Sequence, residues 1–173
     1  MEEIFEILKY TIPSLIVFVA AYFILKKFMD NEYRKQVFEL KQSNLKQITP
    51  IRLQAYERST LFLERIGMEN MIKRVNKAGM KAEQLHAALI TSIRDEYEHN
   101  LSQQIYMSSD AWEAVKEAKE ETLRILHTAM ASIGGKGNVM DLSTAVFTIL
   151  EEEGTPPNQK AIEILKREVR RLF

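Results

Sequence analysis

Two carboxylate–histidine pairs have the spacing of metal ligands on a helix. Glu83 precedes His86 by three residues, and Glu96 precedes His99 by three. In di-iron bundles this spacing puts both ligands on one face, but two different helices must each supply a pair, with two further carboxylates. Here both pairs fall on one predicted helix, on different sides of it. The pattern therefore predicts no metal site, and we expect no cofactor.

Other catalytic patterns are equally incomplete. The run Gly-Gly-Lys-Gly-Asn at residues 134–138 lacks the Gly-x-x-x-x-Gly-Lys-Ser/Thr order of a phosphate loop, so we expect a plain turn between helices. The chain has no cysteine and three histidines, none of them beside a nucleophile and an orienting group. We expect no enzymatic activity and no small-molecule substrate, although an enzyme with an unfamiliar helical site stays open as an alternative.

Charge is balanced overall but uneven along the chain. There are 24 basic and 24 acidic residues. Residues 26–52 carry seven basic and three acidic side chains, whereas residues 108–153 carry four basic and nine acidic ones. A basic segment next to an apolar run is typical of proteins at an anionic membrane, although solvated helix faces also scatter charge. No positive domain charge or aromatic–basic platform indicates nucleic-acid binding.

An uncharged apolar run extends from Tyr10 to Leu25 and includes Pro13 and Val17. Its 16 residues fall short of the ~20 that cross hydrocarbon, but from Ile4 to Leu25 a helix would extend about 33 Å. A cleaved signal peptide would have a basic start and a small-residue cleavage site, and neither is present. The run therefore predicts one transmembrane helix, which contacts the lipid bilayer.

The residues after this run predict its orientation. The positive-inside rule places the side that carries more lysine and arginine in the cytoplasm. We therefore expect the N-terminus outside and the bulk of the chain inside. The basic side chains closest to the run are the predicted contacts with lipid headgroups: Lys26, Lys27, Arg34 and Lys35.

Helical periodicity continues through the rest of the chain, interrupted by breakers at Pro50, Gly67, Gly79, 134–137 and 154–157. We expect Pro50 to end one helix or open the next. We expect residues 108–110, with Asp110 in a capping box, and Asp141 to cap later helices. A strand at 144–148 is a minor alternative. The predicted fold is all-α, with one N-terminal transmembrane helix followed by a compact bundle of about five helices. Its expected parts are an anchor (1–29), a basic juxtamembrane helix (30–50) and a cytoplasmic domain (51–173).

A charged face is predicted on the helix that follows Pro50. Glu57 and Arg58 are repeated seven residues later as Glu64 and Arg65, which favours ion pairs at helical spacing. This face is the candidate surface for a protein partner or for self-association: Arg52, Tyr56, Glu57, Arg58, Glu64 and Arg65.

The stretches Pro50–Arg58 and Leu61–Ile66, behind one N-terminal apolar segment, resemble an uncharacterised family of short bacterial single-pass membrane proteins. The resemblance implies the bacterial inner membrane and assigns no activity. The layout is also similar to the membrane-anchored b subunit of rotary ATP synthases, but the breakers argue for a folded bundle and against one long stalk helix. The predicted function is a membrane-tethered adaptor or accessory subunit. A structural protein that binds the lipid surface through residues 26–52 and the basic tail is the alternative.

Overall fold

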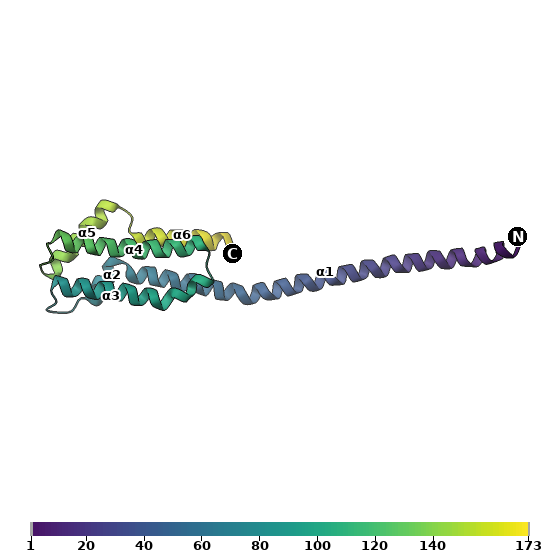
Figure 1. The fold of residues 1–173 in the computed structure, drawn as a ribbon, viewed down its shortest axis with the longest axis horizontal. Helices are drawn as coiled ribbons and strands as arrows, with labels where there is room; N and C mark the ends of the chain where they lie inside the picture. Colours follow the sequence, from purple (N-terminus) through teal and green to yellow (C-terminus); the bar gives the residue numbers. More distant parts are fainter. Residues whose placement is uncertain (1, 173) are drawn as a thin grey trace. The chain divides into compact units, whose positions relative to one another are not determined.

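Helix α1 extends from Glu2 to Ile66 in the computed structural model (Figure 1), which describes residues 2–172 of the chain. The side chains of residues 2–8, Tyr10 and Pro13 lie outside the description. The chain divides into two units, residues 1–49 and residues 50–173. The first unit consists of α1 alone, and the second is a helical bundle that includes the last turns of α1.

The prediction that Pro50 bounds a helix is wrong, because α1 continues through it. Proline has no amide hydrogen, so the carbonyl of Lys46 loses its helical partner, and the ring strains this turn. Lys46 and Pro50 are both exposed, so water reaches the turn and can hydrate the freed carbonyl. The helix has many unbroken turns on either side of Pro50. Because helix formation is cooperative, these turns keep the segment helical despite one missing hydrogen bond.

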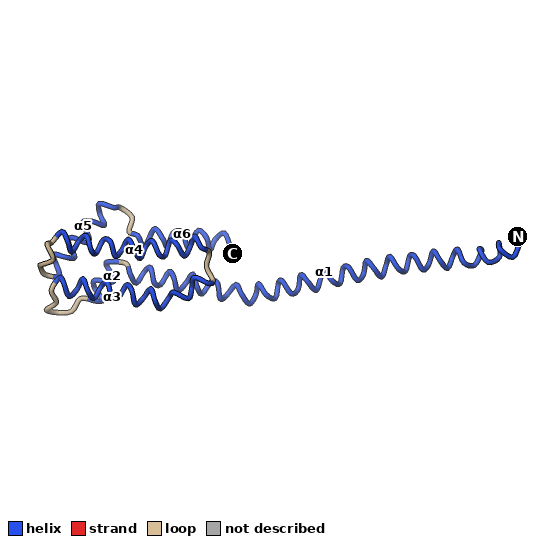
Figure 2. The backbone as a smooth tube through the Cα atoms, in the orientation of Figure 1, coloured by secondary structure: helices blue, strands red, loops and turns tan. Residues whose placement is uncertain are grey.

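The second unit contains five further α-helices, joined by short loops and turns that Figure 2 colours tan. Residues 2–172 contain no strand, so the chain is all-α as predicted, and the alternative of a strand at 144–148 is excluded. The elements are α2 (Met68–Val75), α3 (Ala82–Asn100), the 3-10 turn η1 (Leu101–Ile105), α4 (Ser109–Ser132), α5 (Val139–Glu153) and α6 (Pro157–Leu172).

One continuous apolar core holds this bundle together. Five of the helices each contribute a leucine that is at most 1% exposed. Full burial of such a side chain contributes about 1.5–3 kcal/mol to folding. The five leucines are Leu63 of α1, Leu89 of α3, Leu126 of α4, Leu142 of α5 and Leu165 of α6.

The caps of α4 and α5 differ from the prediction. Ser108, and not Asp110, caps α4, since its hydroxyl accepts the Ala111 amide at 3.1 Å. Asn138 caps α5, and Asp141 is the third residue of that helix, where its carboxylate accepts the Asn138 amide at 2.8 Å. In each helix the capping residue lies three positions before the amide whose hydrogen bond it accepts. Ser108 accepts from Ala111, and Asn138 accepts from Asp141.

The N-terminal unit leaves its apolar side chains uncovered. Val17 is 68% exposed and Leu25 is 61% exposed, and every described residue from Ser14 to Gln36 is exposed. Within the described part of the chain, no helix combines the length and the apolar character needed to cross a membrane. The predicted span includes Tyr10 and Pro13, whose side chains are outside the description.

Candidate functional site

A carboxylate on α6 ties three elements together at one end of the bundle. The Tyr56 hydroxyl of α1 donates to Oε1 of Glu168 at 2.6 Å, and the Ser108 hydroxyl donates to Oε2 at 2.7 Å. Tyr56 is only 2% exposed. Hydrogen bonds to a charged acceptor are stronger than neutral ones, so this Glu168 network should fix α6 against α1 and the start of α4.

The environment of Tyr56 keeps its hydroxyl protonated. Burial raises the pKa of the phenol above its usual range, and the hydrogen bond to Glu168 raises it further. At neutral pH the hydroxyl is therefore a donor and not a base or nucleophile. The network has the chemistry of a structural support.

A groove of about 730 Å³ runs between α1 and α3 on the surface of the same bundle. The α1 wall presents Arg58 and Arg65, and the α3 wall presents Asp95 and Glu96. Leu61, which is 55% exposed, gives the groove an apolar side chain that solvent reaches. Besides these five residues, the groove is lined by Phe62, Ala88, Thr91, Ser92, His99 and Asn100.

The two arginines of this α1–α3 groove differ in their contacts. Arg65 Nη1 lies 3.0 Å from each carboxylate oxygen of Glu96, and the side chains are 58% and 21% exposed. An exposed pair of this kind contributes at most about 1 kcal/mol. Arg58 is exposed and makes no ion pair with any described residue. Its guanidinium can therefore bind a carboxylate of another molecule, with two parallel hydrogen bonds.

The structure divides the predicted charged face among several places. Arg58 and Arg65 line the α1–α3 groove together, whereas Glu57 lies in a smaller groove of about 400 Å³ between α1 and α6. Glu64 lies near the loop that opens α6, and Arg52 donates to the Tyr106 carbonyl at 3.2 Å. Tyr56 is inside the bundle, as described above. Sequence periodicity placed these residues near one another, but it could not show which neighbouring helix each one faces.

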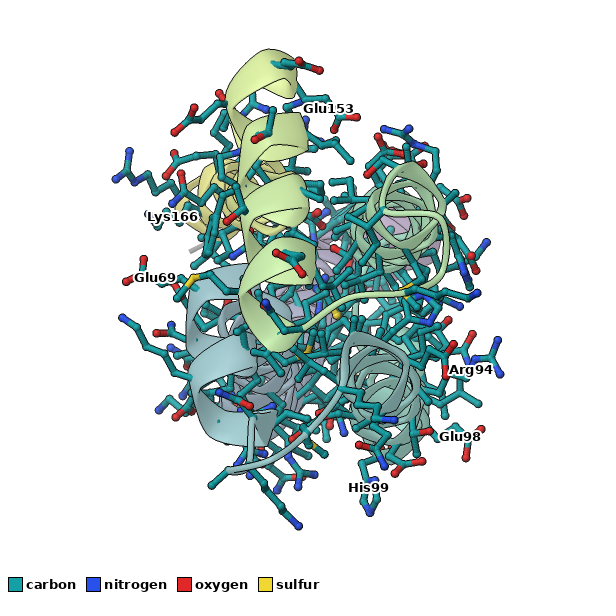
Figure 3. All side chains as sticks on the ribbon, turned by 90° about the vertical axis from the view of Figure 1, so that its left-hand side faces the viewer. Glu69, Arg94, Glu98, His99, Glu153 and Lys166 are labelled. Carbon is teal, nitrogen blue, oxygen red and sulfur yellow. The ribbon has the colours of Figure 1, made fainter. Side chains whose placement is uncertain are left out.

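The carboxylate–histidine pairs do not converge. Glu96 binds Arg65, and the His99 ring contacts the Asp95 carbonyl at 2.6 Å, so that side chain stays close to its own helix. Figure 3 shows His99 pointing away from the bundle. His86 instead packs edge to face against His127, with ring centroids 5.2 Å apart. No group of three or more histidine, aspartate or glutamate side chains in the described part of the chain could hold a metal ion.

The predicted lipid-contact residues all lie on the helix of the first unit. Lys26, Lys27, Arg34 and Lys35 are exposed. At 1.5 Å per residue, Lys26 and Lys27 follow Leu25 by about 1.5–3 Å, and Arg34 follows it by about 13 Å. The two lysines are therefore much closer to the apolar run than the other two basic residues are.

Sequence reasoning missed Glu168, and it named Ser108 only as part of the capping run at residues 108–110. A serine three residues before the Ala111 amide is a recognised signal for the cap itself. Nothing in the sequence shows which residues the Glu168 carboxylate would contact. Its role depends on two partners that lie 112 and 60 residues away in the chain.

Comparison with known protein families assigns the chain to one of them. A family described as a family of unknown function (DUF7935) matches residues 2–172. The chain belongs to this family. The match confirms the predicted resemblance to an uncharacterised family, while its bacterial and membrane aspects stay predictions. No curated protein and no solved structure matches the chain.

Proposed function

We propose that this member of the family is a membrane-tethered interaction protein without catalytic activity, which acts as an adaptor or accessory subunit of a larger complex. Its N-terminal apolar run would anchor the chain in the bacterial inner membrane, and the bundle would bind a protein partner on the cytoplasmic side. The observation that carries the proposal is the α1–α3 groove, where Arg58, which has no ion-pair partner in the described part of the chain, lies beside an exposed apolar side chain on a well-packed scaffold.

The chemistry of the groove indicates what would bind there. Arg58 offers a guanidinium without an ion-pair partner among the described residues, and Leu61 offers apolar area. Arginine is common at binding hot spots, where charge and apolar contact act together. A partner segment with a carboxylate and a neighbouring apolar side chain fits these two groups. Asp95 and Glu96 on the opposite wall would repel a segment that is acidic throughout, so the partner should be of mixed charge.

Charge reversal at Arg58 tests the groove. Full-length Arg58→Glu, purified from membranes in mild detergent, should lose a co-purifying partner that the natural chain retains. Arg94→Glu is the matched control, because Arg94 points away from the bundle in Figure 3 and does not line the groove. Equal partner recovery with Arg58→Glu, or a natural chain that purifies without any partner, would contradict the proposal.

Membrane attachment is supported by the absence of charge from Tyr10 to Leu25 and by the lysines that follow. Because 16 residues extend only about 24 Å, the span would also have to include the turn before Tyr10. Carbonate washing should leave the chain in the membrane pellet. Val17→Asp should weaken retention, since an aspartate at the centre of a span costs about 2.5–3.5 kcal/mol, and Leu45→Asp should not. Release of the natural chain by carbonate would refute the anchor.

A second candidate is a lipid-binding structural protein, and the Glu168 network favours it. Glu168 is the sole acidic residue among the last ten, and it bonds to Tyr56 and Ser108 of the bundle. Arg167, Arg170 and Arg171 are exposed on the final turns of α6. A charge reversal of these three arginines should then reduce contact with anionic vesicles at low salt. Unchanged binding would eliminate this candidate.

A further inference from the structure

An apolar stripe follows one face of α1 beyond the apolar run. Five apolar side chains and one asparagine fall within an arc of about 100°, given 100° per residue, although Asp30 and Gln47 fall in the same arc and the opposite face, which is mostly polar, includes Phe28 and Phe38. Met29 is 69% exposed, Tyr33 70% and Leu40 65%, so solvent reaches all three side chains. We call this set the stalk stripe: Met29, Tyr33, Val37, Leu40, Asn44 and Ile48.

Lipid cannot cover most of this stripe if Tyr10–Leu25 spans the membrane, a step that rests on the proposed function. The first unit is one uninterrupted helix, so the stripe continues in the direction of the span. At 1.5 Å per residue, Ile48 is about 35 Å from Leu25, whereas the headgroup layer is roughly 5–8 Å thick. Most of the stripe would therefore lie in water, and its partner must be a protein.

We propose that the stalk stripes of two copies pack together as a parallel, two-stranded coiled coil. Two copies with the same anchor and topology leave the membrane side by side, in the same direction and at the same level. Asp30, Val37 and Asn44 take the first core position of the heptad, and Tyr33, Leu40 and Gln47 take the second. Three of these six core positions are polar, which favours pairing in one register at a cost in stability.

Charges beside the stripe favour the parallel arrangement. Arg34 and Lys41 follow the second core position on one flank, whereas Gln36 and Ser43 lie on the other flank. In a parallel pair each flank faces the opposite flank of the partner, so the basic side chains meet uncharged ones. In an antiparallel pair the two basic flanks would face each other and repel.

The size of the stripe indicates how the pair would be maintained. Its six side chains present roughly 100 Å² each, by comparison with the 150–250 Å² that an aromatic side chain buries. The total of about 600 Å² per copy is below the ~800 Å² per partner of a standard interface. Confinement in one membrane raises the effective concentration of the second copy and compensates for the small area. Pairing should therefore weaken when the membrane is dissolved.

Disulfide cross-linking tests the pair directly, because the natural chain has no cysteine. Full-length Leu40→Cys and Asn44→Cys place a thiol in the stripe. Glu39→Cys and Lys46→Cys place one on the opposite, equally exposed face and are the matched controls. With a mild oxidant on intact membranes, the stripe positions should give at least about ten times more covalent dimer than the controls. Equal yields on both faces, or no dimer from reactive thiols at 40 and 44, would refute the coiled coil.

A second substitution separates specific pairing from chance collision. Leu40→Asp in the Asn44→Cys chain should lower the dimer yield about tenfold, and Lys46→Asp should leave it unchanged. Unchanged Trp112 fluorescence would confirm that the bundle is still folded. Carbonate washing of the same membranes reports on the anchor independently. Cross-links in a chain that carbonate releases would refute the anchor and keep the pair, and a retained chain without cross-links would do the reverse.

Discussion

The two units of this chain are both helical, yet they differ in where their apolar side chains lie. In residues 50–173, five helices each bury a leucine in a shared core. In residues 2–49, side chains such as Val17, Phe18 and Leu40 are at least 65% exposed. Helix formation therefore does not imply burial. The bundle buries its apolar side chains within the chain, whereas most of those described in the first unit are left exposed.

The most direct test of this comparison is to replace one leucine by alanine in each unit. Leu89→Ala should lower the free energy of unfolding of the bundle by about 2–5 kcal/mol, because Leu89 is fully buried. Leu40→Ala should change it by less than about 0.5 kcal/mol. Urea unfolding in mild detergent can be followed by Trp112, the one tryptophan, which is 7% exposed in the bundle. Equal losses would mean that the first unit contributes to the core after all.

A pair of tyrosines extends the comparison to polar contacts. Tyr56→Phe removes one donor from Glu168 and should cost the bundle about 1.5–3 kcal/mol, the value of a hydrogen bond to a charged group. Tyr33→Phe, on the exposed stripe, is the control and should have no measurable effect. Thermal unfolding monitored by circular dichroism gives both values. If Tyr56→Phe proves neutral, water must replace the lost donor and the network does not hold α6.

The acid side of the stability profile should depend on a histidine inside the bundle. Burial lowers the pKa of His86 below its ordinary value of about 6.5, and the nearby His127 lowers it further. The folded bundle then binds this proton more weakly than the unfolded chain does. The resulting stability is present above about pH 6.5 and is lost as the pH falls through the lower, folded pKa.

Substitution of this histidine should therefore flatten the profile. His86→Gln should lose less stability than the natural chain between pH 7.5 and pH 5. His99→Gln, at an exposed position, should follow the natural chain. Urea midpoints at several pH values measure the difference. Parallel profiles for all three chains would show that His86 is not responsible.

The smallest effect is expected from the surface of the bundle, which resembles the first unit in its exposure. Arg65→Ala breaks an exposed ion pair with Glu96 and should cost no more than about 1 kcal/mol. Arg58→Ala, at a position without an ion pair among the described residues, should cost less still. High salt should remove the difference between the two variants. A loss above 2 kcal/mol for Arg65→Ala would place this pair in the core rather than on the surface.

The sequence alone predicted the all-α class and the glycine breaks at Gly67, Gly79 and 134–137, because helical periodicity and glycine act over a few neighbouring residues. It failed at Pro50, where the length of the helix on both sides outweighs a local defect. It also gave no sign of the Glu168 network or of the ion pair between Arg124 and Glu153. These contacts join residues that are 29 to 112 positions apart, so their geometry depends on how the helices pack.

The distance of α6 from the N-terminal apolar run along the chain has a consequence for biosynthesis. Its buried Leu165 and its carboxylate at Glu168 follow Leu25 by 140 and 143 residues. At 5–20 residues per second, they are made about 7–30 s after Leu25. The N-terminal apolar run is therefore synthesised well before the bundle can fold. During that interval α4 lacks its α6 neighbour, and nascent chains should be most exposed to chaperones and proteases then.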